Sequence, residues 1–322
     1  MPLPHLTLHI GHPKSGSTTL QSFLFQNWKS IAEQGLHMPS ASMSVASSQT
    51  PSGNTLQKLE ALNKVKDANP IRDWITEIQR HQETPRLLIS SEIMAGFGFP
   101  KLFAQAAELA NFQIIYYIRR QDKLLLSAWK QWALKRGLSL DELIDKRIND
   151  MQPNFIGTIT RWRKAIPNAT FHIRFIDPEF LYSNDLINDF CQAADIDQTH
   201  LQRPKSHLNM SPDGRILSFL SRHSYLFKSA HDHAPMAFLQ NEKQGGDKIG
   251  YGLTQEQFDK IYQHYEPQNQ ELLKLFHPEM AGTPVIKKES APIWDRATGF
   301  SVEEERSYLG NDLINRLFKA CQ

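Results

Sequence analysis

The sequence has only two cysteines in 322 residues, Cys191 and Cys321, and they do not have metal-ligand spacing. A disulfide framework is therefore not expected, and a reducing compartment is the simpler assumption. Long apolar runs are also missing, because no run approaches the roughly 18 apolar residues that a membrane-spanning helix needs. The chain instead enters a predicted strand almost at once. We therefore expect a cytoplasmic protein without a membrane span.

Strong charge of one sign is absent as well. The 36 Lys and Arg residues nearly balance the 34 Asp and Glu residues, which leaves a formal net charge of +2. Lys and Arg are scattered along the chain, and no basic tract is longer than two residues. This pattern argues against a nucleic-acid partner. Any binding of an anion must depend on a local arrangement of charge.

Short apolar runs alternate with helical patterns along the chain, as in βαβ units of a parallel sheet. This pattern predicts an α/β fold with three layers and a central parallel sheet, in a single domain over residues 1–322. We expect insertions near residues 40–70 and 222–250, and a C-terminal extension after about residue 278. The predicted strands are Leu6–Ile10, Arg86–Ser90, Phe112–Ile118 and Phe171–Ile176. The predicted helices are Thr18–Gln34, Lys101–Ala110, Leu124–Arg136 and one that starts at a capping box, Ser139–Glu142.

Polar residues follow each predicted strand directly. The segments are Gly11–Thr18, Ser90–Glu92, Arg119–Arg120 and Asp177. Ligands of open parallel sheets bind outside the carboxyl ends of the strands. We therefore predict that an anion-binding loop, a carboxylate and two guanidinium groups form the active site at this edge.

The loop between the first strand and the first helix has features of a phosphate-binding loop. Leu8–Leu20 reads L-H-I-G-H-P-K-S-G-S-T-T-L, similar to a Walker A loop, but its lysine, Lys14, stands three positions early. The backbone N–H groups of Ser15–Thr18 and the start of the helix favour an anion. The shifted lysine suggests a substrate other than a nucleoside triphosphate.

Two motifs carry a resemblance to a known family. P-K-S-G-S-T-T-L resembles the 5′-phosphosulfate loop of sulfotransferases that use 3′-phosphoadenosine 5′-phosphosulfate (PAPS). Tyr116–Trp129 is similar to the 3′-phosphate motif of that family, with Arg119 and Ser127 eight residues apart. Ile10–Gln21 and Arg119–Asp122 are most like bacterial, carbohydrate-type members. The resemblance implies a P-loop, nucleoside-kinase-like sulfotransferase fold, with PAPS as donor, the desulfonated nucleotide PAP as product, and no metal.

The resemblance also implies roles for single residues. Lys14 would contact the transferring sulfuryl group, and Glu92 would be the general base, with His12 as the rival. Arg119 and Ser127 would bind the 3′-phosphate. The loop residues implied to bind the 5′-phosphate are Ser15, Gly16, Ser17, Thr18 and Thr19.

Each of these residues also has a plain structural interpretation. Glu92 can be a helix-start glutamate favoured by the dipole, and Arg119 can form a surface ion pair with Asp122. Ser127 can be an ordinary helix serine, and Arg120 can assist at the site or simply pair with a neighbour. Farther along, Lys243 or Lys248 can contact the nucleotide or belong to a connector, and Pro267–Leu272 resembles a late helix of the family.

The expected reaction is transfer of a sulfuryl group to a hydroxyl or amine of an acceptor, with a carbohydrate or glycolipid favoured. One alternative is a P-loop phosphotransferase such as a small-molecule kinase, although the sequence has no recognisable Walker B aspartate. Another is a non-catalytic protein that binds PAP or PAPS. The sequence leaves the acceptor and the oligomeric state open.

Overall fold

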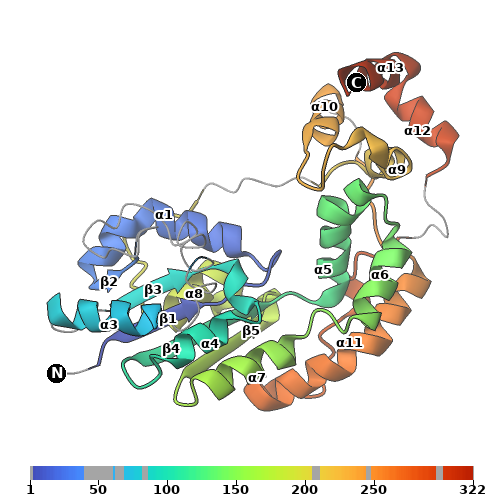
Figure 1. Ribbon diagram of the computed structural model, residues 1–322. Helices are drawn as coiled ribbons and strands as arrows, with labels where there is room; N and C mark the ends of the chain where they lie inside the picture. Colours follow the sequence, from blue (N-terminus) through green and yellow to red (C-terminus); the bar gives the residue numbers. More distant parts are fainter. Residues whose placement is uncertain are drawn as a thin grey trace. The chain divides into compact units, whose positions relative to one another are not determined.

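The structure is a computed structural model that describes residues 3–39, 61, 69–81, 86–204, 211–243, 248–294 and 300–321. The chain divides into two compact units (Figure 1). The first comprises Met1–Arg119 and Asn154–Ser206, and the second comprises residues 120–153 and 207–322. The single domain expected over residues 1–322 stays a prediction. The loop expected at residues 40–55 lies outside the described residues.

A parallel sheet forms the centre of the first unit, which confirms the predicted α/β class. Its strand order is β2-β3-β1-β4-β5, and every pairing between neighbours is parallel. The strands are β1 (His5–His9), β2 (Leu36–His37), β3 (Arg86–Ser90), β4 (Asn111–Ile118) and β5 (Thr170–Phe175). β1 is central, so the loop that follows it lies between the ends of β3 and β4.

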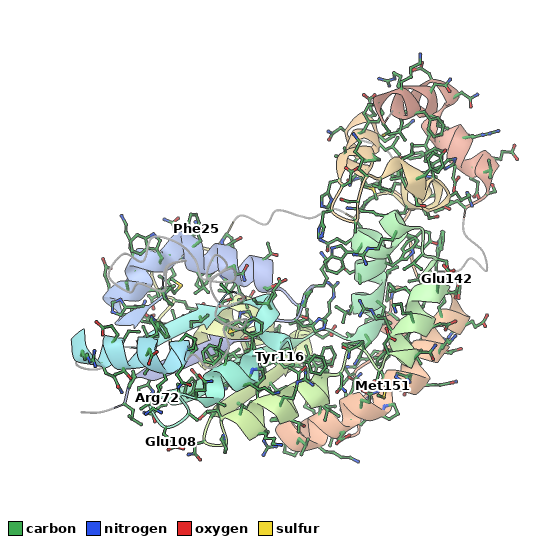
Figure 2. The ribbon with its side chains drawn as sticks, viewed as in Figure 1. Phe25, Arg72, Glu108, Tyr116, Glu142 and Met151 are labelled. Atoms are coloured by element: carbon green, nitrogen blue, oxygen red, sulfur yellow. The ribbon has the colours of Figure 1, made fainter. Side chains whose placement is uncertain are left out.

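Helices cover both faces of this sheet, which gives the three expected layers. Residues alternate between the faces of a strand, so Tyr117 packs with α1 and α8 while Tyr116 faces the ring of Phe155 on α7. Phe103 of α4 packs against Phe112 and Trp162 on that same side. Tyr116 lies inside the unit, whereas Phe25 is exposed (Figure 2). The helices of this unit are α1 (Ser17–Glu33), α3 (Pro70–His81), α4 (Phe99–Ala104), α7 (Phe155–Ala165) and α8 (Leu186–Ala193).

The predicted helix over Lys101–Ala110 is wrong in its second half. α4 ends at Ala104, and the chain continues in tight turns, with Ala106 and Leu109 each donating to a carbonyl three residues back. The turns bring Asn111 to the start of β4, where its N–H donates to the Pro4 carbonyl at 2.8 Å. The apolar pattern of residues 101–110 therefore indicates which side chains are buried, but it does not predict where the helix ends.

The second unit is helical and has its own apolar core. The predicted helix over Leu124–Arg136 is present but not uniform, because α5 (Gln121–Ala128) continues as a π-helical segment and a 3₁₀ turn. It ends at Gly137, whose φ of 75° is left-handed, in agreement with the predicted stop. The Ser139–Glu142 capping box is also present. The other helices are α6 (Leu140–Asn149), α9 (Gly214–Arg222), α10 (Ala234–Glu242), α11 (Gln255–Phe276), α12 (Val302–Leu309) and α13 (Asn311–Ala320).

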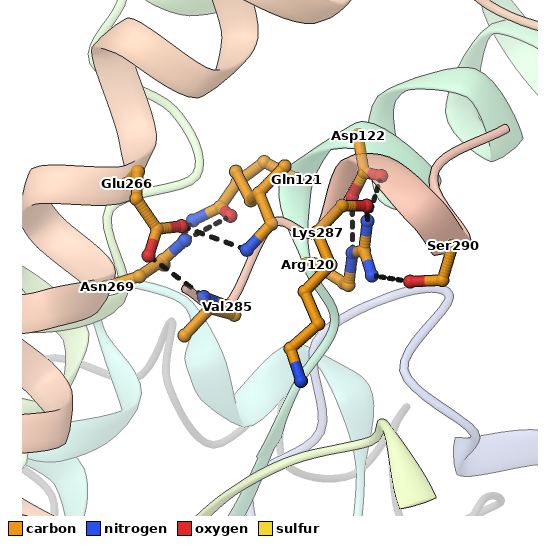
Figure 3. A network of polar contacts seen from close by, with 9 residues as sticks. Arg120, Gln121, Asp122, Glu266, Asn269, Val285, Lys287 and Ser290 are labelled. Carbon is orange, nitrogen blue, oxygen red and sulfur yellow. Dashed lines mark hydrogen bonds and ion pairs between the residues drawn. The ribbon is translucent and has the colours of Figure 1, made fainter. Parts of the chain in front are cut away.

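Buried polar contacts tie the segment after α11 to α5 and α11 (Figure 3). The carboxylate of Glu266 accepts from the N–H groups of Val285 and Ile286 at 2.8 and 2.9 Å. The side-chain amides of Gln121 and Asn269 bond reciprocally at 2.9 and 3.0 Å. Asn269 belongs to the Pro267–Leu272 motif. Its side-chain hydrogen bonds with Gln121 join α11 to α5 within the second unit.

Candidate active site

The loop between β1 and α1 turns tightly through two left-handed residues. Lys14 has φ 69° and Gly16 has φ 77°. A Cβ on Gly16 would also stand 2.5 Å from the Leu186 side chain, so the backbone here approaches its neighbour closely. A non-glycine residue in this conformation costs roughly 1–2 kcal/mol. The loop thus holds Lys14 in a strained backbone position of the kind that is concentrated at functional sites.

The start of α1 offers unpaired backbone donors to this loop. The first helical hydrogen bond is from Leu20 to the Gly16 carbonyl, so the N–H groups of Ser17, Thr18 and Thr19 precede it. No described side chain caps the helix, and its first turn has no acidic residue. The hydroxyl of Ser15 is buried and has no hydrogen-bond partner among the described residues. These groups together favour an anion at the loop.

A carboxylate lies against the same loop. Glu92 starts a 3₁₀ turn directly after β3, and its Oε1 accepts a hydrogen bond from the Ser17 hydroxyl. The backbone fixes this approach, because the N–H of Ser91 donates to the His9 carbonyl at 3.0 Å. The Nδ1 atom of His9 is also 2.8 Å from the Ser90 hydroxyl. Glu92 therefore reaches the anion-binding loop from the neighbouring strand, as the sequence predicts.

A guanidinium group completes the cluster from the other side of β1. Arg119 follows β4 directly, and its Nη1 donates to the Lys14 carbonyl at 3.0 Å. The pKa of Lys14 lies below the ordinary lysine value because the ammonium is partly buried and because Arg119 repels it, while Glu92 acts in the opposite direction. Lys14, Glu92 and Arg119 are thus close enough to influence one another electrostatically.

The structure places His12 differently. Its Nδ1 is 3.0 Å from the Pro13 carbonyl oxygen, and its ring meets the ring of Phe155 edge-on at 5.4 Å. His12 therefore faces α7, whereas Glu92 contacts Ser17. Thr18 and Thr19 are exposed on the first turn of α1.

Arg120 pairs with a neighbour, which is one of the two alternatives that the sequence leaves open for it. Its side chain is buried in the second unit, where it donates to Asp122 at 2.9 and 2.7 Å. It also donates to the Ser290 hydroxyl and the Lys287 carbonyl at 2.6 and 2.8 Å. The ion pair suggested for Arg119 and Asp122 thus belongs to the residue one position later.

Other predicted contacts belong to the second unit. Ser127 lies on α5 and is half-buried, and its role at the 3′-phosphate stays a prediction. Lys243 lies with its Nζ 5.1 Å from the centre of the Tyr308 ring. This contact is with an aromatic side chain of the same unit.

The residues behind the loop do not belong to either of the two sequence motifs. His9 stands in a predicted apolar strand, where a polar residue two positions before Gly11 was the available signal. The helix that contains Phe155 also has a local signal, because Asn154 is a favoured N-cap residue and Phe155, Ile159 and Trp162 recur at helical spacing. These residues support the loop and the turn that contains Glu92.

Comparisons with known proteins give distant similarities. The chain matches no protein-family model. It is 25% identical over 127 residues to an uncharacterized protein from Archaeoglobus fulgidus, a region that covers 39% of this chain and 34% of that protein. The chain thus spans about a third of the length of this curated relative.

Two solved structures are also similar. A sulfotransferase from Alicyclobacillus acidocaldarius has a TM-score of 0.36 and 14% identity, over 70% of this chain and 93% of that one. Retinol dehydratase in a complex with retinol and PAP has a TM-score of 0.30 and 12% identity, over 88% of this chain and 83% of that one. At these values neither structure assigns a function to the chain. Within the described residues, no helix combines the length and the apolar character that crossing a membrane requires.

Proposed function

We propose that this chain transfers a sulfuryl group from PAPS to a hydroxyl or amine of an acceptor. The observation that carries the proposal is the convergence of Lys14, Glu92 and Arg119 on one anion-binding loop. They come from the carboxyl ends of three adjacent parallel strands, where ligands of such sheets bind. Lys14 and Arg119 belong to the two motifs that resemble those of sulfotransferases, and Glu92 resembles the glutamate that carbohydrate sulfotransferases place after an early strand.

The residues of the loop fit a bound phosphate ester. The N–H groups of Ser17, Thr18 and Thr19 and the buried Ser15 hydroxyl are donors, and α1 adds the positive end of its dipole. Arg119 is our candidate for the 3′-phosphate, because its planar fork matches two phosphate oxygens. We assign Ser127 to the same phosphate on its spacing alone.

The chemistry requires one proton acceptor and one stabilising cation. In the reaction, the acceptor oxygen forms a bond to sulfur as the bond from sulfur to the phosphate oxygen breaks, and the acceptor loses a proton. We assign that proton to the Glu92 carboxylate, which already lies at the loop. The ammonium of Lys14 stabilises the negative charge that develops on the departing phosphate oxygen. Removal of such a preorganised charge typically lowers the rate by about 10²-fold or more.

Titration calorimetry with PAP tests the binding part of this proposal. We expect the wild type to bind PAP and Arg119→Gln to bind it at least about tenfold more weakly, since a charge-assisted contact contributes roughly 1.5–3 kcal/mol. Lys29→Ala is the matched control, because Lys29 is an exposed lysine on α1. Absence of binding to PAP, or magnesium-dependent transfer of phosphate from ATP, would contradict the proposal.

Glu92→Gln separates an enzyme from a nucleotide sensor. This variant should bind PAP at least as tightly as the wild type, because a negative charge beside the anion has been removed. Transfer of labelled sulfate from PAPS to a panel of saccharides and glycolipids should fall by about 10²-fold or more, within the range for a general base. If no acceptor in the panel is ever labelled by the wild type, the sensor alternative is favoured.

A further inference from the structure

Helix α7 borders the proposed site at two places within the first unit. At its start, the ring of Phe155 meets the ring of His12 in the anion-binding loop at 5.4 Å. Farther along, the Nε1 of Trp162 donates to the Met94 carbonyl at 3.1 Å, within the turn that starts at Glu92. Helix α7 therefore lies beside both the anion-binding loop and the turn that starts at Glu92, and its half-buried Arg161 is the neighbour of Trp162 along the chain.

Arg161 on this helix carries a charge that no carboxylate among the described residues balances. Its Nη2 donates to the neutral hydroxyl of Thr158 at 3.0 Å, and its Nε is buried without a hydrogen-bond partner in the described part of the chain. Partial burial lowers the pKa of Arg161 below the ordinary arginine value. A partly desolvated cation without an anionic partner is costly to maintain, so an anion that binds there gains more than it would from a solvated surface arginine.

An aromatic ring adjoins this guanidinium. Phe97 follows the Glu92 turn by two residues and is 69% exposed, and the Arg161 guanidinium carbon lies 4.0 Å from its ring centre. A local hydrogen bond holds the turn before Phe97, because the N–H of Gly96 donates to the Ile93 carbonyl at 2.8 Å, and a Cβ on Gly96 would stand 2.9 Å from that oxygen. The segment that follows the Glu92 turn thus presents an exposed apolar ring beside a guanidinium.

We infer that Arg161 and Phe97 select an acceptor saccharide that carries an anionic group. The guanidinium would bind a carboxylate or another oxyanion of the acceptor, and the phenyl ring would pack on an apolar face of a sugar ring. This inference rests on the proposed function, since it assumes that the acceptor lies at Glu92. It makes Arg161 a specificity-determining residue for the acceptor and gives it no part in binding the nucleotide.

A pair of acceptor probes that differ at one carbon tests the inference. With protein saturated with PAP, we would measure the affinities of 4-nitrophenyl β-D-glucuronide and of 4-nitrophenyl β-D-glucoside by titration calorimetry. The wild type should bind the glucuronide about tenfold or more tightly than the glucoside, as expected for one charge-assisted contact. Arg161→Gln should reduce this preference to less than about twofold.

Arg163→Gln is the matched control, because Arg163 is an exposed arginine on the same helix. It should keep the preference for the glucuronide, and neither variant should change the affinity for PAP. If the wild type binds PAP but shows no preference for the glucuronide, or if Arg161→Gln keeps that preference, the inference is overturned. If the wild type does not bind PAP, the proposed function itself has failed, so the two failures are distinguishable.

Discussion

At the scale of single residues, His9 is the most strongly perturbed group behind the loop. The imidazole is fully buried between the rings of Tyr117 and Phe190, and this burial lowers its pKa from 6.5 to about 4. The folded protein therefore holds a neutral imidazole where the unfolded chain binds a proton. Stability attributable to His9 is present above pH 6.5 and is lost as the pH falls towards 4.

This titration predicts a loss of about 2 kcal/mol of stability between pH 7 and pH 4.5, because each unit of pKa shift corresponds to about 1.4 kcal/mol. His9→Asn keeps a side chain that can bond to Ser90 but cannot titrate. The variant should be less stable than the wild type at pH 7 and should lose less stability on acidification. Urea unfolding at both pH values measures the difference, and equal losses in the two proteins would show that His9 is not the cause.

The lowered pKa of Lys14 predicts that affinity for PAP depends on pH in the alkaline range. Its pKa is lowered mainly by burial and then by Arg119, so the ammonium is lost at a lower pH than an ordinary lysine would lose it. Affinity for PAP should therefore decline as the pH rises towards this lowered pKa. Because Glu92 raises the pKa of Lys14, Glu92→Gln should move the decline to a still lower pH.

Calorimetric titrations with PAP between pH 7 and pH 10 would measure this shift. Lys14→Ala should remove the decline altogether, which identifies the titrating group. Identical profiles for the wild type and Glu92→Gln would mean that the carboxylate and the ammonium do not interact as the structure indicates.

Individual site residues could be predicted where a sequence motif fixes their position relative to the end of a strand. Arg119 follows β4 directly, and Lys14 and Ser17 belong to the loop and the helix start that follow β1, so their positions in the sequence place them at one edge of the sheet. The partner of Asp122 could not be assigned in this way. Arg119 and Arg120 are neighbours with the same side chain, and only packing in the second unit decides which of them is buried.

At the scale of elements, the Arg120–Asp122 pair connects the start of α5 to the segment around Lys287–Ser290. Both side chains are almost completely buried, at 1% and 0% exposure. Asp122→Asn should cost about 3–5 kcal/mol, since it leaves a buried guanidinium without its counter-charge. Chemical denaturation would measure the cost.

The double variant Arg120→Met with Asp122→Leu should be more stable than Asp122→Asn, because neither charge then remains buried. In both proteins PAP affinity should stay within about threefold of the wild type. A loss of PAP binding as large as that of Arg119→Gln would show instead that Arg120 is a nucleotide ligand.

Elements with a strong local pattern could also be predicted. β3 and the capping box at Ser139 are found where the sequence places them, because a short apolar run and a capping pattern are local properties. β2 has two residues, too few to produce a pattern, and its place at the sheet edge depends on pairing with β3. The π-helical segment Trp129–Ala133 has the same apolar spacing as an α-helix, so the sequence could not distinguish them.

At the scale of the whole molecule, the division into two units was not visible in the sequence. Each unit is assembled from two separate stretches of the chain. At one point the chain passes from the first unit to the second between Arg119 and Arg120. A single uninterrupted motif, R-R-Q-D, spans that point. The amino-acid composition does not change where the chain passes from one unit to the other. Contacts between segments that are distant in the sequence decide to which unit a residue belongs.

Binding of PAP should stabilise the folded protein by mass action, by about 2.7 kcal/mol at a free concentration 100 times the dissociation constant. Hydrogen exchange then reports where the nucleotide acts. The N–H groups of Ser17–Thr19 have no helical partners and should exchange quickly in the free protein and slowly with PAP.

The start of α6 is the internal control for this experiment. There the Ser139 hydroxyl already accepts from the N–H of Glu142 at 3.1 Å, and the first turn contains two acidic residues. Its exchange rates should not change beyond the general stabilisation. If PAP slows exchange equally at both helix starts, the nucleotide does not bind at the loop, because a local ligand protects the amides that it contacts more than distant ones.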